Sequence, residues 1–163
     1  MTEKGLQDRK KVTDYFRDKH IDQAFSSPFK RAIDTIQPVI DEKKLTLSSI
    51  SDFRERKIGD EWISNFHEYC ERQWEDFDYK LRNGESLKET QKRNVAALKL
   101  VLSKYQDQTM IIGGHGTAIG SVINYYDPSF KYEAFAMIQP KNPFIVKMSF
   151  DGEKYLEYKV VIF

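Results

Sequence analysis

Cysteine and histidine are scarce in this sequence of 163 residues. Cys70 is the single cysteine, and the three histidines are His20, His67 and His115. One cysteine excludes an internal disulfide framework and fits a reducing compartment, for which we expect the cytoplasm. Structural zinc sites use four cysteine or histidine ligands, so this composition argues against one. We therefore expect neither a metal ion nor another cofactor.

The sequence also has no long apolar run and no large net charge. No stretch approaches the roughly 18 apolar residues of a membrane helix. Residues 1–4 include acidic and basic side chains, unlike a secretory signal peptide. The 26 lysines and arginines nearly balance 25 aspartates and glutamates, for a formal net charge of +1. Without a broad positive field, we expect neither nucleic acid nor a membrane as a partner.

Residues that can build a core are plentiful. Hydrophobic residues make up 40% of the chain and aromatic residues 13%, which is typical of a folded domain rather than a disordered chain. The length fits a single domain over residues 1–163. Short apolar segments at 21–25, 45–50 and 109–113 are expected strands, and helical patterns separate them. This alternation predicts an α/β layered domain.

Local signals set several element boundaries. Thr2 is an expected cap for the first helix, and Ser27 with Pro28 should open the second. Ser86 and Glu89 form a capping box at the start of a long helix that ends at about residue 105. Two apolar runs around Asp151-Gly152 predict a C-terminal β-hairpin, over residues 144–150 and 155–162.

The glycine-rich turn around His115 is the most informative segment. It follows the buried strand at 109–113 and precedes a helix. Ligands bind at this end of strands in open α/β sheets, where helix N-termini offer free N–H groups. The same histidine could instead cap the helix or fill the core. A dinucleotide-binding turn is rejected because only 43 residues follow Gly120 and they end in a hairpin, and no Gly-Lys-Ser/Thr of a P-loop is present.

Arg31 occupies an equivalent place after the expected strand at 21–25. It lies in the first turn of the helix that Ser27 and Pro28 should open. A planar guanidinium beside free helical N–H groups would clamp a phosphate. The alternative is an ordinary solvated arginine on the surface.

Five segments, in order along the chain, resemble one known family. They are Thr2-Glu3-Lys4-Gly5-Leu6; Ser26-Ser27-Pro28 followed by Arg31-Ala32 and Thr35; Phe53-Arg54-Glu55 followed by Gly59; Gly84-Glu85-Ser86 with Arg93; and Gly114-His115-Gly116. Together they resemble the histidine phosphatase superfamily. The resemblance implies the phosphoglycerate-mutase-like fold, a three-layer αβα sandwich with a mostly parallel sheet and a C-terminal antiparallel hairpin.

One motif of that family is missing. Its nucleophilic histidine lies in an Arg-His-Gly motif after the first strand, and residues 1–163 contain no such motif. By the resemblance, the chain looks truncated at its N-terminus, and the missing strand would lie between the strands at 21–25 and 109–113. Either these two strands close on each other, or another segment fills the gap. We favour filling by a partner or an upstream segment, with a homodimer or a strand-swapped oligomer as the possible assemblies. His20 and His67 receive no role.

The resemblance also implies roles for the residues that are present. Arg31 would clamp the phosphate, His115 would donate a hydrogen bond to it, and the backbone N–H groups of Gly116 and Thr117 would add to the site. Glu55, buried under Trp62 or Phe66, would be the general acid.

The implied activity is hydrolysis of phosphomonoesters through a phosphohistidine, with no metal. The substrate would be a small phosphorylated molecule, or the ligand inorganic phosphate. Without the nucleophile we expect this chain to be inactive, and a non-catalytic phosphate-binding or interaction module is the alternative. A phosphoglycerate mutase is the second alternative, which the short aromatic segment between Gly59 and Gly84 disfavours.

Overall fold

In this computed structural model, which describes residues 3–60 and 62–163, three strands form a parallel sheet in the order β2-β1-β3. The strands are β1 (Gln23–Ser26), β2 (Leu47–Ser49) and β3 (Met110–Gly113). In register, Ala24 of β1 faces Leu47 of β2 on one side and Ile111 of β3 on the other. The expected strands are thus present, each somewhat shorter than its apolar run.

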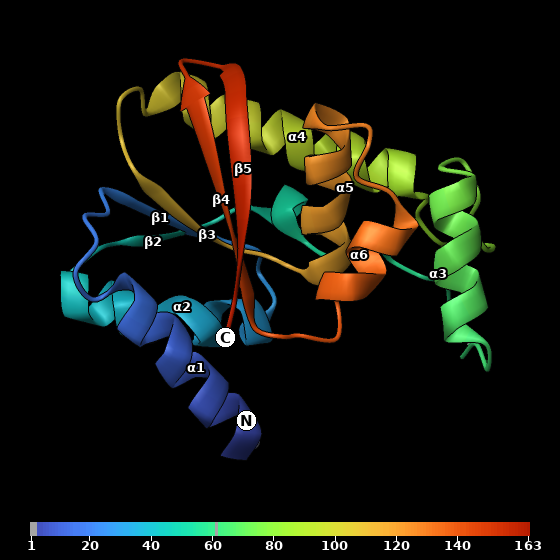
Figure 1. The fold of residues 1–163 in the computed structure, drawn as a ribbon, viewed down its shortest axis with the longest axis horizontal. Helices are drawn as coiled ribbons and strands as arrows, with labels where there is room; N and C mark the ends of the chain where they lie inside the picture. The colour runs from blue at the N-terminus through green and yellow to red at the C-terminus, as the bar shows by residue number, and fades with distance from the viewer. Residues whose placement is uncertain (1–2, 61) are drawn as a thin grey trace.

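Helices cover both faces of this sheet (Figure 1). The helices α1 (Glu3–Phe16) and α2 (Lys30–Lys43) pack on the face that carries Ala24 and Ile111. The helices α4 (Leu87–Lys104) and α5 (Gly116–Tyr126) lie on the other, where Phe25 contributes to the core. Successive strand residues point to opposite faces, so the apolar run of β1 contributes to both cores. The three-layer α/β arrangement is confirmed.

The cap of α4 is the one that the sequence predicted. The Ser86 hydroxyl accepts a hydrogen bond from the Glu89 N–H, and the Glu89 carboxylate accepts one from the Ser86 N–H. Thr2, the other expected cap, lies outside the described residues. None of the helices in the described ranges is both long and apolar enough to cross a membrane.

The segment after β2 is partly helical. A short 3-10 helix, η1 (Ser51–Phe53), precedes an extended stretch, and α3 (Phe66–Glu75) follows. Trp74 of α3 stacks on Phe135 of α6 (Tyr132–Ile138), with ring centroids 5.0 Å apart. Trp62, by contrast, is 95% exposed. The aromatic residues of this segment therefore divide between core and surface.

The C-terminal hairpin consists of β4 (Phe144–Asp151) and β5 (Lys154–Ile162). The turn uses Gly152 at φ +58°, a left-handed conformation that glycine adopts without strain. The hairpin is confirmed, and within the described residues it forms a sheet separate from the parallel one.

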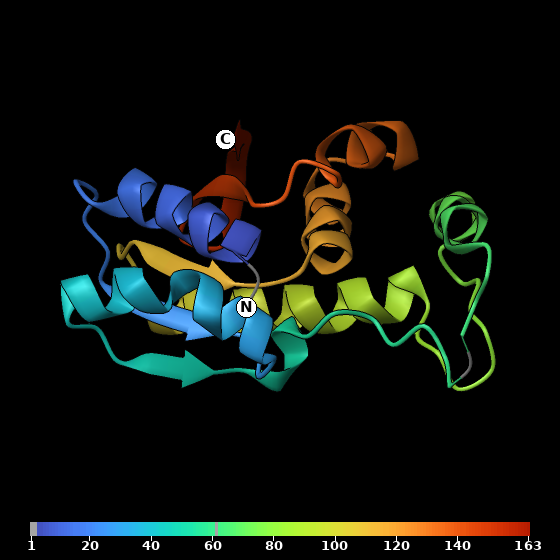
Figure 2. The same ribbon diagram turned by 90° about the horizontal axis from the view of Figure 1, so that it is seen from below.

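The expected position of the missing strand is wrong. The strands β1 and β3 pair directly along all four residues of each, from Gln23 opposite Met110 to Ser26 opposite Gly113. No space for a strand remains between them, because hydrogen-bonded neighbours already lie at the normal strand spacing. Figure 2 instead shows β2, β1, β3 and then the hairpin in that spatial order. The interruption in the sheet lies beyond β3.

Candidate functional site

The carboxyl ends of β1 and β3 meet and place Ser27 beside His115. The Ser27 N–H donates to the Gly113 carbonyl at 2.9 Å. A Cβ at Gly113 would lie 2.7 Å from Ser26 Oγ and 3.0 Å from the Ala32 carbonyl oxygen. Glycine at this position therefore lets the first turn of α2 approach the end of β3, which brings Arg31 to the same place.

His115 makes a hydrogen bond with each of its ring nitrogens. Nδ1 accepts from Arg31 Nε at 3.2 Å, and Nε2 lies 2.7 Å from Ser27 Oγ. An arginine Nε–H only donates, so Nδ1 must carry a lone pair and Nε2 the proton. His115 is therefore the Nε2–H tautomer and donates to Ser27, which is fully buried.

This environment keeps His115 neutral. Burial, followed by the positive charges of Arg31 and Arg93, lowers the pKa of His115 from 6.5 to about 4. With its proton on Nε2, the ring cannot remove a proton from the Ser27 hydroxyl. A serine nucleophile activated by this histidine is thus excluded in the present arrangement.

Ser27 differs from its predicted role as helix N-cap. The helix α2 begins at Lys30, with Phe29 in the cap position. The Ser27 hydroxyl accepts from the Phe29 N–H at 3.2 Å, but its second contact is His115. The helix begins later than predicted because Phe29 remains extended, at φ −75° and ψ 126°. The contact with His115 escaped prediction because no local pattern signals a partner 88 residues away.

Glu55 lies at the N-terminus of α5. Its carboxylate accepts hydrogen bonds from the N–H groups of Thr117 at 3.0 Å and Ala118 at 3.1 Å. It also accepts from the Arg56 N–H at 2.9 Å. Carboxylates are favourable at this end of a helix because the unpaired N–H groups carry partial positive charge.

Two expectations about Glu55 and its surroundings need revision. Trp62 does not bury Glu55, because this tryptophan is almost fully exposed. The N–H of Thr117, expected to bind phosphate, is already bonded to Glu55. The N–H of Gly116 has no partner among the described residues, so it is the group that this helix end leaves for a ligand.

Arg56 is a site residue that the sequence did not reveal. Its side chain is 3% exposed and donates to Gln73 Oε1, Thr117 Oγ1 and Cys70 Sγ. A guanidinium nitrogen also lies 3.8 Å from Glu55 Oε1. Arg56 thereby ties the Glu55 segment to α3 and α5. Burial of Arg56 could not be predicted from the sequence, because an arginine next to a glutamate is usually exposed to solvent.

Arg93 holds the same segment from the other side. It donates to the carbonyl oxygens of Asp52, Arg54 and Glu55, and both Glu85 oxygens accept from it. Burial acts to raise the pKa of Glu85, but Arg93, the Lys57 N–H and the charge of Arg54 together hold it below its usual value. Glu85 is thus an anion that fixes the Arg93 fork.

The other two histidines lie away from this cluster. His20 contacts Asp22 at 2.7 Å before the start of β1, at the opposite end of the strand. His67, on the exposed side of α3, contacts the Tyr132 hydroxyl. Neither histidine is brought to His115.

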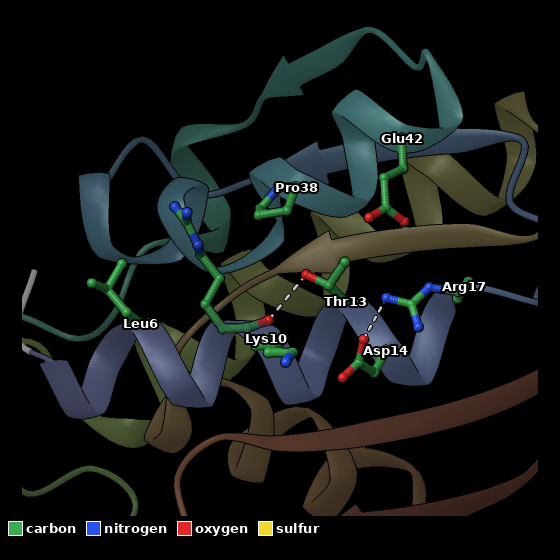
Figure 3. Close-up of a pocket in the computed structure, with 8 residues that line it drawn as sticks. Leu6, Lys10, Thr13, Asp14, Arg17, Pro38 and Glu42 are labelled. Carbon is green, nitrogen blue, oxygen red and sulfur yellow. Dashed lines mark hydrogen bonds and ion pairs between the residues drawn. The ribbon is translucent and has the colours of Figure 1, made fainter.

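A smaller pocket of about 230 Å³ lies between α1 and α2 (Figure 3). Several of its polar side chains are already paired with groups of α1 itself. Thr13 donates to the Arg9 carbonyl, and Arg17 donates to Asp14. Thr13, Asp14 and Arg17 are therefore already engaged in contacts within residues 9–17.

The family model for the histidine phosphatase superfamily, branch 1, matches residues 1–160. The chain belongs to this superfamily. The resemblance inferred from the five segments is therefore confirmed. A search of curated protein sequences gave no match.

Solved structures similar to this superfamily member include several phosphatases. A phosphoserine phosphatase variant from Entamoeba histolytica, in complex with phosphoserine, has 21% identity and a TM-score of 0.76, covering 96% of this chain and 81% of its own. YhfR from Bacillus stearothermophilus has 19% identity and a TM-score of 0.73 over the same shares. A mycobacterial glucosyl-3-phosphoglycerate phosphatase has 14% identity and a TM-score of 0.72, covering 99% and 85%. At these identities the likeness establishes the fold, here phosphoglycerate-mutase-like.

Proposed function

We propose that this histidine phosphatase family member binds the phosphate group of a small phosphomonoester between Arg31, His115 and the start of α5. The observation that carries the proposal is a convergence of unused donors. Within the described residues, Arg31 uses only Nε, toward His115, which leaves its two terminal nitrogens without hydrogen-bond partners. Gly116, which follows His115 in the chain and lines the same cavity as Arg31, offers its N–H. A guanidinium fork and a helix N-terminus together match the geometry and charge of a phosphate.

His115 changes its role when an anion arrives. A bound phosphate attracts the Arg31 fork and adds negative charge beside the ring, and both effects raise the pKa of His115. Nδ1, released from Arg31, can then take a proton and donate it in a hydrogen bond to a phosphoryl oxygen. This donation would stabilise charge on the equatorial oxygens during transfer.

Glu55 is the proposed proton donor to the leaving alkoxide, a role carried over from the family. It lies next to Gly116, at the mouth of the same site, and is fixed there by Arg56 and Arg93. To act as an acid it must first hold a proton. We expect that step to weaken its contact with the start of α5.

The nucleophile is not supplied by the arrangement around His115. Ser27 has no base, and His20 and His67 lie elsewhere. We propose that residues 1–163 bind phosphate but turn over less than about one-thousandth as fast as an intact family phosphatase, because losing a covalent nucleophile costs many decades of rate. A phosphate-binding module without catalysis is the second candidate function, favoured by this same observation.

A phosphatase is favoured over a mutase because the segment between Gly59 and Gly84 is short and leaves Trp62 exposed. Cys70 is a buried free thiol without a disulfide bond, which supports a cytoplasmic location.

Sulfate titration followed by NMR of His115 and Arg31 tests the phosphate site, since sulfate keeps its charge across the pH range. We expect Arg31→Ala to weaken binding at least about tenfold, as the loss of a charge-assisted fork should. Lys30→Ala is the matched control, because Lys30 is a neighbouring exposed cation that pairs with Asp34. Equal weakening by both variants, or shifts that avoid His115, would contradict the site.

Hydrolysis of p-nitrophenyl phosphate separates the two candidate functions. Residues 1–163 should show no turnover above the stated limit, with or without His67→Ala. Robust turnover abolished by His67→Ala would instead make His67 the nucleophile and refute our placement of the chemistry.

A further inference from the structure

The Ser27 hydroxyl lies between two hydrogen-bond donors in the interior of the protein. Ser27 is fully buried. Its Oγ is 3.2 Å from the Phe29 N–H and 2.7 Å from His115 Nε2. A serine oxygen can accept two hydrogen bonds, one on each lone pair. With the proton of His115 on Nε2, Ser27 is therefore the acceptor that this buried ring N–H requires.

The parallel sheet fixes the position of this hydroxyl relative to the ring. Ser27 directly follows β1, and its N–H donates to the carbonyl of Gly113, the last residue of β3. His115 comes two residues after Gly113 and occupies the cap position of α5. Side chains attached to paired strands are held more precisely than those on loops. The contact between Ser27 and His115 is thus built into the pairing of β1 with β3.

Two other neighbours of the His115 ring cannot replace Ser27. The Phe29 ring meets the imidazole in a T-shaped contact, with centroids 5.2 Å apart, and such a contact does not select one ring nitrogen. Arg31 Nε donates to Nδ1, but Arg31 must leave that nitrogen when a bound anion attracts its guanidinium. Among the described residues, the hydrogen bond to Ser27 is then the one that still orients the ring.

A protonated ring depends on this acceptor more than a neutral ring does. Once Nδ1 holds a proton, Nε2–H belongs to a cation, and hydrogen bonds from charged donors are roughly twice as strong as neutral ones. The charges of Arg31 on α2 and Arg93 on α4 both oppose a positive ring. Glu55 lines the same cavity as His115, but its carboxylate is bonded to the start of α5. The bound anion must therefore supply the compensating charge, and Ser27 the acceptor.

We propose that Ser27 is a positioning residue of the phosphate site. Its hydroxyl accepts the Nε2–H of His115 and keeps Nδ1 turned toward the anion, in the neutral ring and in the protonated ring alike. This role rests on the proposed phosphate site and adds a requirement to it. An anion binds with uptake of a proton at Nδ1 only while Ser27 holds the opposite side of the ring.

Ser27→Ala removes the acceptor, and Ser26→Ala is its matched control. Ser26 is the neighbouring residue and is equally buried, but it donates its hydroxyl to the Gly113 carbonyl rather than contacting His115. In sulfate titrations followed by NMR, we expect Ser27→Ala to weaken binding at least about tenfold and Ser26→Ala less than about twofold. Circular dichroism checks that both variants fold.

Proton uptake at the His115 ring gives a readout that a loosened fold alone would not change. Nitrogen-15 shifts should show Nε2 protonated and Nδ1 unprotonated in the free protein. At a pH between the His115 pKa values of the free and the sulfate-bound protein, sulfate should protonate Nδ1 with uptake of about one proton. Calorimetry in buffers of different ionisation enthalpy measures this uptake, which should fall by at least about half in Ser27→Ala.

Three outcomes would overturn the role of Ser27. They are an unchanged sulfate affinity in Ser27→Ala, an equal loss of affinity in Ser26→Ala, and a weaker affinity with unchanged proton uptake, which would make Ser27 a support of the fold alone. The phosphate site itself is judged on the unsubstituted protein. Sulfate shifts there that avoid Arg31 and His115 would refute the site, whereas binding at these residues with an unaffected Ser27→Ala would refute the positioning role and leave the site standing.

Discussion

The two sides of the candidate site use arginine in opposite ways. Arg31 is exposed, and its side chain makes one hydrogen bond to the residues that the structure describes, the one to His115, so its two terminal nitrogens remain available. The guanidinium of Arg56 is buried and that of Arg93 is half-buried, and both are committed to carbonyl, amide, hydroxyl, thiol or carboxylate partners. The difference separates the groups that can bind a ligand from those that hold the site together. It also predicts that substitutions on the two sides will affect different measurements.

The largest expected effect is on stability, from Arg93→Ala. The change leaves three carbonyl oxygens without their Arg93 donors, and the Glu85 carboxylate keeps only Arg54 and the Lys57 N–H. Because the Arg93–Glu85 pair is only partly buried, we expect a loss of about 3 kcal/mol of unfolding free energy from the hydrogen bonds to the charged guanidinium, measurable by urea denaturation. Arg54→Ala is the control, because Arg54 bonds the same Glu85 from a more exposed position; it should cost less than about 1 kcal/mol. Equal losses of unfolding free energy in the two variants would show that the hydrogen bonds of Arg93 do not hold the site together as we infer.

The next effect is a pH dependence from His115. Its folded pKa of about 4 lies below the ordinary 6.5, so the unfolded chain binds more protons between these values. Stability therefore falls as pH falls through this window and levels off below about pH 4. We expect a loss of about 2 kcal/mol between pH 7 and 5 that is absent in His115→Gln. Identical pH profiles for the two proteins would show that His115 is not held neutral.

The smallest expected effect comes from Glu55→Gln. Glu55 lies between the groups that can bind a ligand and the arginines that hold the site together. The amide loses the charge that favours the start of α5, at a cost of about 1 kcal/mol. The same change removes a negative charge beside Gly116, so sulfate should bind a few times more tightly. Glu75→Gln, an exposed site at the end of α3, is the control. Weaker sulfate binding by Glu55→Gln would mean that Glu55 supports the anion site rather than competes with it.

Local sequence patterns were enough to predict the strands and most of the long helices, but not the short helices η1 and α6. The capping box of Ser86 and Glu89, the hairpin around Gly152 and the short apolar strands depend on neighbouring residues, so local patterns sufficed to predict them. Five separate motifs also determined the family, because their order along the chain is itself information. Arg31 and His115 were both placed at strand ends, where the topology of a parallel sheet brings them to one edge.

Tertiary structure alone decided how those residues are used. The Ser27 contact fixes the proton on His115, and the start of α5 binds Glu55. The burial of Arg56 and the pairing of β1 with β3 likewise depend on segments far apart in sequence. The partner of a polar side chain in a distant segment is set by packing in three dimensions, and such a contact leaves no periodic pattern in the local sequence. For the same reason the interruption of the sheet was expected from a missing motif but placed on the wrong side of β3.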